Sequence, residues 1–122
     1  MLNSYKDLIV WRRGIDLAKT IYKLTDRFPP HEQFGLISQM RRSAVSIPSN
    51  IAEGSARGTR KDYGQFLRIA YGSSAELETQ IELGKQLGFG SKEDYNEADR
   101  QLNEIRRMLN VLISKISLKP KT

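Results

Sequence analysis

The sequence predicts an all-α fold, an antiparallel up-and-down four-helix bundle whose second helix is kinked at a proline. Apolar residues recur at spacings of three and four along most of the chain, which is the pattern of amphipathic helices. No useful stretch shows the alternation typical of strands. Short links separate the helical segments, and short links keep consecutive helices side by side. A chain of 122 residues suffices for one domain, 1–122, with a single modest core.

The first helix is expected over residues 7–28. Its apolar residues form two adjacent stripes that together make a broad buried face: Leu8, Trp11, Ile15, Ala18 and Tyr22, then Val10, Leu17, Ile21, Leu24 and Phe28. Ser4 and Asp7 have the spacing of a capping box at the start. Pro29 and Pro30 are expected to end the helix, because proline lacks the amide donor and disfavours the α conformation in the residue before it.

The second helix is expected over residues 31–57, because Pro30 is suited to the first position of a helix. Its apolar positions recur at helical spacing: Phe34, Ile37, Met40, Ala44, Ile47 and Ile51. Pro48 leaves the carbonyl of Ala44 without its usual donor, which predicts a kink at a cost of about 3 kcal/mol. Three serines lie where their hydroxyls can bond the loosened backbone: Ser43, Ser46 and Ser49.

The third and fourth helices are expected over residues 60–87 and 92–116. Each has a capping-box-like start, Thr59 with Asp62 in one case and Ser91 with Asp94 in the other. Glycine ends the second and third helices, at Gly58 and in the run Gly88-Phe89-Gly90. These start and stop signals set the bounds of both helices.

The second half of the second helix looks at first like a functional loop. Asn50 and Glu53 form a polar edge beside the predicted core stripe. Glu53 precedes Arg57 by four residues, which predicts an ion pair along the helix. Gly54 permits the close approach of another backbone. We therefore interpret Pro48, Asn50, Glu53 and Gly54 as architecture, with a place at a subunit interface, rather than as chemistry.

No constellation of residues points to catalysis or to a cofactor. The single histidine, His31, lies at a helix start, and there is no cysteine. The glycines match neither a Walker loop nor a dinucleotide-binding fingerprint. No Glu-x-x-His pair accompanies the acidic residues of the third and fourth helices, as a di-iron bundle would require. We expect a protein that is not an enzyme and uses no metal or cofactor.

The composition favours a cytoplasmic protein with a polyanionic partner. The absence of cysteine suits a reducing compartment, and the apolar run near the N-terminus is too short for a signal peptide or a membrane span. The formal net charge is +6 and the isoelectric point is about 9.7. In an up-and-down bundle, residues 1–15, 45–70 and 105–122 share one end, and they include twelve basic and three acidic residues.

This predicted basic end is the candidate site for RNA or DNA. Phosphate backbones are attracted by such a surface, and binding that releases counterions reads no bases and weakens with salt. The candidate residues are Arg12, Arg13, Arg57, Arg60, Lys61, Arg106 and Arg107. Tyr5, Tyr63 and Phe66 lie nearby in sequence and are candidates for base stacking, although Phe66 also fits the core. The alternative is a scaffold whose basic end meets an acidic protein partner, including the acidic end of another copy.

Two stretches resemble a known family. DLIVW near the start, followed by RRSAVSIPSNIAEGSARGTRKDYGQFLRIAYGSSAELETQ, is similar to the 23S rRNA intervening-sequence protein family, also called the four-helix-bundle protein family. The resemblance spans about residues 7–116 and implies a homopentameric ring of four-helix bundles with an unsettled biochemical role. The family in turn resembles the accessory protein of diversity-generating retroelements, which implies nucleic acid and a reverse transcriptase as partners.

Overall fold

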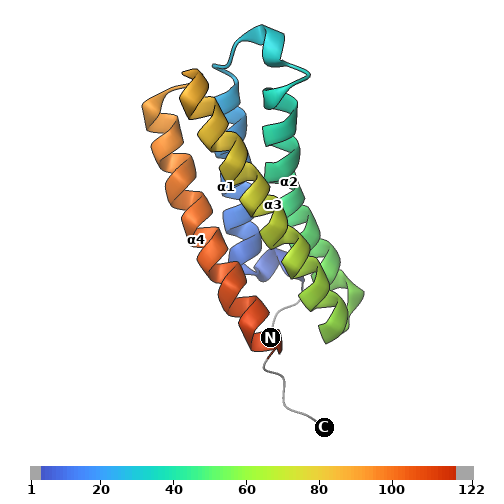
Figure 1. The fold of residues 1–122 in the computed structure, drawn as a ribbon. Coiled ribbons are helices and arrows are strands. Elements are labelled where there is room, and N and C mark those ends of the chain that lie inside the picture. The colour runs from blue at the N-terminus through green and yellow to red at the C-terminus, as the bar shows by residue number, and fades with distance from the viewer. Residues whose placement is uncertain (1–3, 118–122) are drawn as a thin grey trace.

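The computed structural model describes residues 4–117 and is a four-helix bundle over that range. The helices are α1 (Ile9–Thr25), α2 (Leu36–Arg57), α3 (Arg60–Leu87) and α4 (Lys92–Ser117), with short 3-10 turns η1 (Tyr5–Asp7) and η2 (Pro30–Glu32). Each helix runs antiparallel to the next (Figure 1). α1 packs against α2 and α4, and α3 packs against the same two helices. No strand occurs among the described residues. The predicted up-and-down bundle is confirmed.

The core follows the bundle axis and draws one apolar face from each helix. The largest fully buried apolar side chains are Leu17, Ile21, Leu24, Met40, Ile47, Ile51, Leu67, Leu77, Leu102, Ile105 and Leu109. On α1 the buried stripe is narrower than predicted, because Ile15 and Tyr22 are exposed. One predicted stripe of this helix therefore forms the core, and the other lies mostly along its boundary.

The bounds of α1 differ from the predicted 7–28 at both ends. The hydroxyl of Ser4 accepts a hydrogen bond from the backbone N–H of Lys6 (3.1 Å), so it caps η1 rather than α1. The helix ends at Thr25, whose hydroxyl donates to the carbonyl of Ile21 (2.8 Å). Phe28 is still buried, because a turn after α1 folds it back against the core. The prolines follow this turn instead of ending the helix.

The start of α2 also corrects the prediction, because the helix begins at Leu36 and not at residue 31. Pro30 opens the short η2 turn instead. A carboxylate oxygen of Glu32 accepts a hydrogen bond from the backbone N–H of Leu36 (3.1 Å) and thus caps α2. Phe34, which has the apolar spacing of the predicted helix 31–57, lies before α2 and is 95% exposed.

α2 continues through Pro48 without a break, and the proline packs against α1. A Cβ atom on Gly14 of α1 would lie 3.1 Å from the Cβ of Pro48, so the glycine allows this close crossing. The amide of Asn50 donates to the carbonyl and hydroxyl of Ser46 (2.8 and 2.9 Å), and the hydroxyls of Ser46 and Ser73 are 2.9 Å apart. Ser46 therefore links α2 to α3. The kink itself stays a prediction.

The close approach predicted at Gly54 is confirmed and involves α3 of the same chain. A Cβ on Gly54 would lie 2.7 Å from the Cβ of Phe66 and 3.4 Å from the Cα of Tyr63. The turn that follows α2 contains Gly58, whose φ of 84° places it in the left-handed region. Gly54 is thus buried in an internal helix contact.

The predicted caps of α3 and α4 are both present. The hydroxyl of Thr59 accepts from the backbone N–H of Asp62 (3.1 Å), and that of Ser91 accepts from Asp94 (3.2 Å). At the end of α3, Gly88 has a φ of 75° and the N–H of Phe89 donates to the carbonyl of Gly84 (3.0 Å), as in a Schellman motif. The bounds of α3 coincide with the expected 60–87.

Candidate functional site

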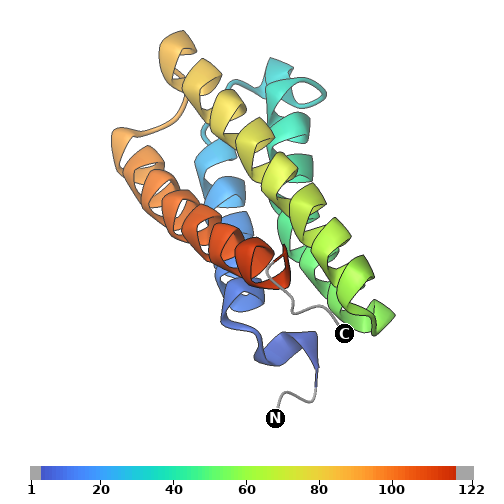
Figure 2. The same cartoon turned by 60° about the horizontal axis from the view of Figure 1, so that its bottom comes forward.

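One end of the bundle gathers the start of α1, the end of α2, the start of α3 and the end of α4 (Figure 2). We call this the basic end and define it by the described residues 4–15, 45–70 and 105–117. Its lysines and arginines are Lys6, Arg12, Arg13, Arg57, Arg60, Lys61, Arg68, Arg106, Arg107 and Lys115, and its acidic residues are Asp7, Glu53 and Asp62. Lys119 and Lys121, which belong to the predicted basic end, lie outside the described residues.

Four of the seven candidate cations already hold a carboxylate. The pairs are Arg12 with Asp7 (3.8 Å), Arg13 with Glu104 (3.7 Å), Arg57 with Glu53 (2.9 Å), and Arg106 with Glu78. The pair between Glu53 and Arg57 is the one predicted from their spacing. The pairs of Arg12 and Arg57 are substantially exposed on both sides, so each contributes little stability, and these two arginines remain accessible to a competing anion.

Arg60 and Arg68 bind the end of α4 rather than a carboxylate. Arg60 donates to the backbone carbonyl of Lys115 (2.9 Å), and Arg68 donates to the hydroxyl of Ser117 (2.9 Å). The last carbonyls of a helix carry partial negative charge and have no partner within the helix, so a guanidinium is well placed there. Both arginines therefore help to hold α3 and α4 together.

The side chains of Lys61 and Arg107 form neither an ion pair nor a hydrogen bond with any described residue, and both residues are exposed. Lys6 and Lys115 share this property through their side-chain amines, although sequence reasoning did not select them as candidates. Their positions beside helix ends at the same pole of the bundle are a signal that could have found them. These four cations are the part of the basic end most available to an anionic ligand.

Arg106 is the candidate cation with the most contacts inside the chain. Its guanidinium donates to the hydroxyl of Tyr71 (3.1 Å) and lies 4.8 Å from the centre of that ring. Asn110 donates to the same hydroxyl (3.3 Å). The pKa of Tyr71 is lowered, first by the hydrogen bond from Asn110 and then by the hydrogen bond and charge of Arg106. This cluster joins α3 to α4.

The two tyrosines proposed for base stacking differ in their surroundings. Tyr63 packs against the core, its hydroxyl is buried without a hydrogen-bond partner among the described residues, and burial raises its pKa. Tyr5 is half-buried and meets Trp11 edge to face, with ring centres 5.4 Å apart. Tyr5 is therefore the better placed of the two for a ligand on the surface.

The four residues interpreted as architecture with a place at a subunit interface separate into two pairs. Pro48 and Gly54 are buried in contacts within the chain, against α1 and α3 respectively. Asn50 is half-buried and bonded to Ser46, whereas Glu53 is exposed and paired with Arg57. The first pair has an explanation inside one chain, and only the second presents polar groups at the surface.

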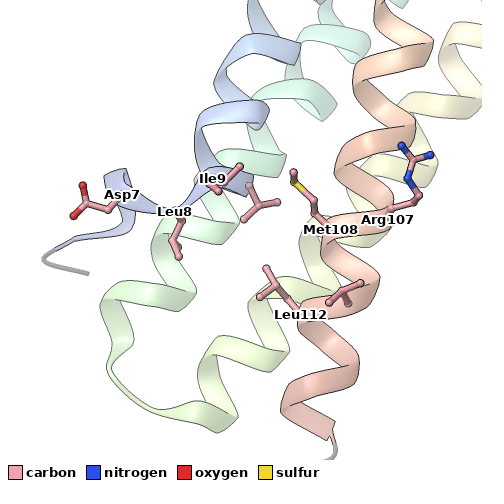
Figure 3. A pocket seen from close by; sticks show the side chains of 8 residues that line it. Asp7, Leu8, Ile9, Arg107, Met108 and Leu112 are labelled. Atoms are coloured by element: carbon pink, nitrogen blue, oxygen red, sulfur yellow. The ribbon is translucent and has the colours of Figure 1, made fainter. Parts of the chain in front are cut away.

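An apolar groove lies at the basic end between the start of α1 and the last third of α4 (Figure 3). Leu8, Ile9 and Val10 line one side, Met108, Val111 and Leu112 line the other, and its volume is about 520 Å³. The charged groups of Asp7 and Arg107 lie at its two sides and point away from it. The groove could not be predicted from the sequence, because its two walls are about a hundred residues apart in the chain.

Residues 4–117 contain no group of three or more His, Cys, Asp or Glu side chains that could hold a metal ion. Within the same range, each helix is too short or too polar to cross a membrane.

Comparisons with known proteins identify related sequences and structures. The family model for the 23S rRNA-intervening sequence protein matches residues 6–111. The chain is also similar to a crystal structure, at 1.70 Å resolution, of a protein of unknown function from the S23 ribosomal protein family of Bacteroides thetaiotaomicron VPI-5482. The sequence identity is 27% and the TM-score 0.76, over 86% of this chain and 98% of the other. No curated protein matches.

Proposed function

The chain belongs to the 23S rRNA-intervening sequence protein family, and from this premise we propose that it is a non-catalytic protein that binds the backbone of RNA or DNA through its basic end. The observation that carries the proposal is the group of four cations there without an ion-pair partner among the described residues: Lys6, Lys61, Arg107 and Lys115. Cations without partners are the ones that can neutralise phosphates at no internal cost.

The proposed mode of binding is electrostatic. Each phosphate neutralised by Lys or Arg releases condensed counterions, and this gain does not depend on the bases. Exposed arginines that now hold carboxylates, such as Arg12 and Arg57, can exchange them for phosphates at little cost, because exposed ion pairs are weak. Binding is therefore tolerant of sequence and falls steeply as salt rises.

We further propose that the protein works in the cytoplasm as an oligomer. A homopentameric ring is what the resemblance to the family implies, and it would carry five copies of the basic end in one particle, which multiplies the affinity for a long polyanion. A reverse transcriptase or another protein is a further expected partner, through the resemblance to the accessory protein of diversity-generating retroelements. Light scattering at micromolar concentration tests the assembly, and a monomer would contradict it.

A charge-reversal experiment tests nucleic-acid binding. Lys61→Glu with Arg107→Glu changes two cations that have no described partner, so the fold should be retained. The matched control is Lys19→Glu with Lys92→Glu, which makes the same change in net charge outside the basic end. With fluorescent single-stranded RNA and duplex DNA, the first variant should lose affinity and reduce the slope of log affinity against log salt by about 2.

Two outcomes would contradict the proposal. One is an absence of binding by the natural chain at low salt. The other is an equal loss of affinity in both double variants, because that would assign binding to net charge and not to the basic end.

A second candidate function is a scaffold for an acidic protein partner. It is favoured by the carboxylates that Arg13 and Arg106 already bind at this end, from Glu104 and Glu78. Polyglutamate and RNA of equal charge, used as competitors against a labelled nucleic acid, separate the two candidates. Stronger competition by polyglutamate would favour the scaffold.

A further inference from the structure

Phe34 has the properties of an anchor for another protein surface. Its side chain is 95% exposed, although it is a large aromatic group in the middle of a folded domain. The turn that carries it is held by three hydrogen bonds: Gln33 N–H to the carbonyl of Pro30 (3.1 Å), Gly35 N–H to that of Glu32 (3.0 Å), and Leu36 N–H to the Glu32 carboxylate (3.1 Å). An aromatic side chain has few rotatable bonds, so on a backbone that is already fixed it loses little entropy on binding, which is typical of interface anchors.

Gly35 lies in this turn at a position with little room for a side chain. A Cβ atom at that position would lie 2.9 Å from the carboxylate oxygen of Glu32 that caps α2. The glycine therefore makes room for the cap, and the cap fixes the backbone on one side of Phe34. The exposure of Phe34 follows from a defined local structure.

The groove at the basic end offers a complementary surface. Among its lining residues, Leu8, Met108 and Leu112 are partly buried against the core, whereas Ile9 and Val111 are 60% and 53% exposed. These side chains are aliphatic and present almost no polar atoms to a ligand. An aromatic ring buries about 150–250 Å² of surface when it enters such a site.

The anchor and the groove lie at opposite ends of the molecule. Phe34 follows η2, at the end where α1 finishes, whereas the groove is built where α1 begins (Figure 1). The half that carries Phe34, residues 16–44 and 71–104, contains eight basic and eleven acidic residues, in contrast to the basic end. A contact between opposite ends of two copies therefore joins halves of opposite net charge, which favours that orientation over basic end against basic end.

We propose that Phe34 of one copy inserts into the groove between α1 and α4 of a second copy. The inference rests on the oligomeric part of the proposed function and names the surfaces that form the contact. Such a contact joins two different patches, so every copy offers one anchor and one groove. Repetition builds a closed ring when the rotation between copies allows it, and an open chain otherwise.

Two substitutions test each side of the contact. Phe34→Ala removes the anchor, and Val111→Glu places a carboxylate in the groove; both positions are exposed, so folding is retained. Leu87→Ala is the matched control, since it removes an apolar side chain that is 51% exposed on α3 and belongs to neither surface. In sedimentation velocity, each test variant should weaken self-association about 30-fold or more, the effect of losing an interface anchor, and the control should behave as the natural chain.

A mixing experiment separates a shared contact from general damage. Phe34→Ala retains an intact groove and Val111→Glu retains an intact anchor, so an equimolar mixture restores one contact and gives a dimer of the two variants. Each variant alone remains a monomer. A mixture that also stays monomeric would overturn the pairing of these two surfaces.

Other results would also overturn the inference. Assembly of Phe34→Ala with the affinity of the natural chain would exclude the anchor. A natural chain that is monomeric but binds nucleic acid would remove this inference and the proposed oligomer while leaving the basic end in place. Assembly that persists in both variants, with loss of nucleic-acid binding in the variant that combines Lys61→Glu and Arg107→Glu, would place the subunit contact elsewhere.

Discussion

The turn between α2 and α3 and the turn between α3 and α4 use the same local chemistry in opposite surroundings. In each, a glycine with a φ of 84° or 75° ends one helix, and a hydroxyl accepts the N–H of an aspartate to begin the next. The α3–α4 turn is packed, because Phe89 lies 5.5 Å from the ring of Phe28. The α2–α3 turn from Gly58 to Lys61 is exposed throughout.

The comparison shows that the glycine and the capping hydroxyl are enough to form a turn. Whether the turn contributes to the core or stays exposed to a ligand depends on the residues that pack against it. The packed turn covers the core at one end of the bundle, so substitutions of its residues are expected to lower the free energy of unfolding. The exposed turn carries Arg60 and Lys61 in the first turn of α3, where the helix dipole disfavours positive charge. A small cost in stability there leaves cations available for a ligand.

The sharpest contrast between the turns is expected from two glycine substitutions. Gly90→Ala combines a φ of 80° with a Cβ that would lie 2.9 Å from Leu24 and 3.0 Å from Phe28, so we expect a loss of about 2–4 kcal/mol. Gly58→Ala has a φ of 84° but open space around it, so the loss should be about 1–2 kcal/mol. Urea unfolding measures both, and equal losses would show that packing does not distinguish the turns.

A tyrosine beside the packed turn should make stability depend on pH. Burial, followed by the charge of Asp99, raises the pKa of Tyr95 to about 12, and its buried hydroxyl has no hydrogen-bond partner among the described residues. An unfolded tyrosine loses its proton near pH 10, so the unfolded state binds fewer protons than the folded state between pH 10 and 12. The free energy of unfolding that Tyr95 contributes below pH 10 is therefore lost as the pH rises from 10 to 12.

Tyr95→Phe should remove this loss and raise stability at pH 7 by about 1 kcal/mol, because a buried polar group without a partner is removed. Thermal unfolding followed by circular dichroism at pH 7, 10 and 11.5 measures both effects. Tyr22→Phe, at an exposed position, is the control. The same decline with pH in Tyr95→Phe as in the natural chain would contradict the assignment.

The smallest expected effect concerns the cations in the first turns of α3 and α4. Lys61→Glu and Lys92→Glu each replace a positive charge near a helix N-terminus, so each should raise the free energy of unfolding by about 0.5 kcal/mol. Only Lys61→Glu should weaken nucleic-acid binding, as measured by fluorescence anisotropy. A loss of stability in Lys61→Glu would show that Lys61 serves the fold and not a ligand.

The features that could be predicted from sequence depend on neighbours along the chain. The caps at Thr59 and Ser91, the ion pair between Glu53 and Arg57, and the close approach at Gly54 all follow from spacings within a few residues or from the absence of a side chain. Phe34 was assigned wrongly because it lies three residues before Ile37, in phase with α2. The apolar spacing of α2 extends in the sequence to residues before Leu36, although the Glu32 cap makes the helix begin at that residue.

The candidate site was harder to predict, because its properties depend on residues far apart in the chain. The positions of the charges follow from the up-and-down order, but their partners do not: Arg13 meets Glu104 and Arg106 meets Glu78 only once the helices pack. The groove likewise requires Leu8 and Leu112 to face each other across two helices. Periodicity identifies which face of a helix is apolar, and it does not say whether the neighbouring helix covers that face completely.

The crossing of α1 and α2 makes two distant positions depend on each other through evolution. Gly14 has no side chain where α1 meets the ring of Pro48, and any larger residue would meet that ring at about 3.1 Å. A lineage that replaced the proline with a smaller residue would relieve this close contact and should accept alanine at position 14 more readily than one that kept the proline. Across relatives, these two positions should therefore change together, although neither touches a ligand.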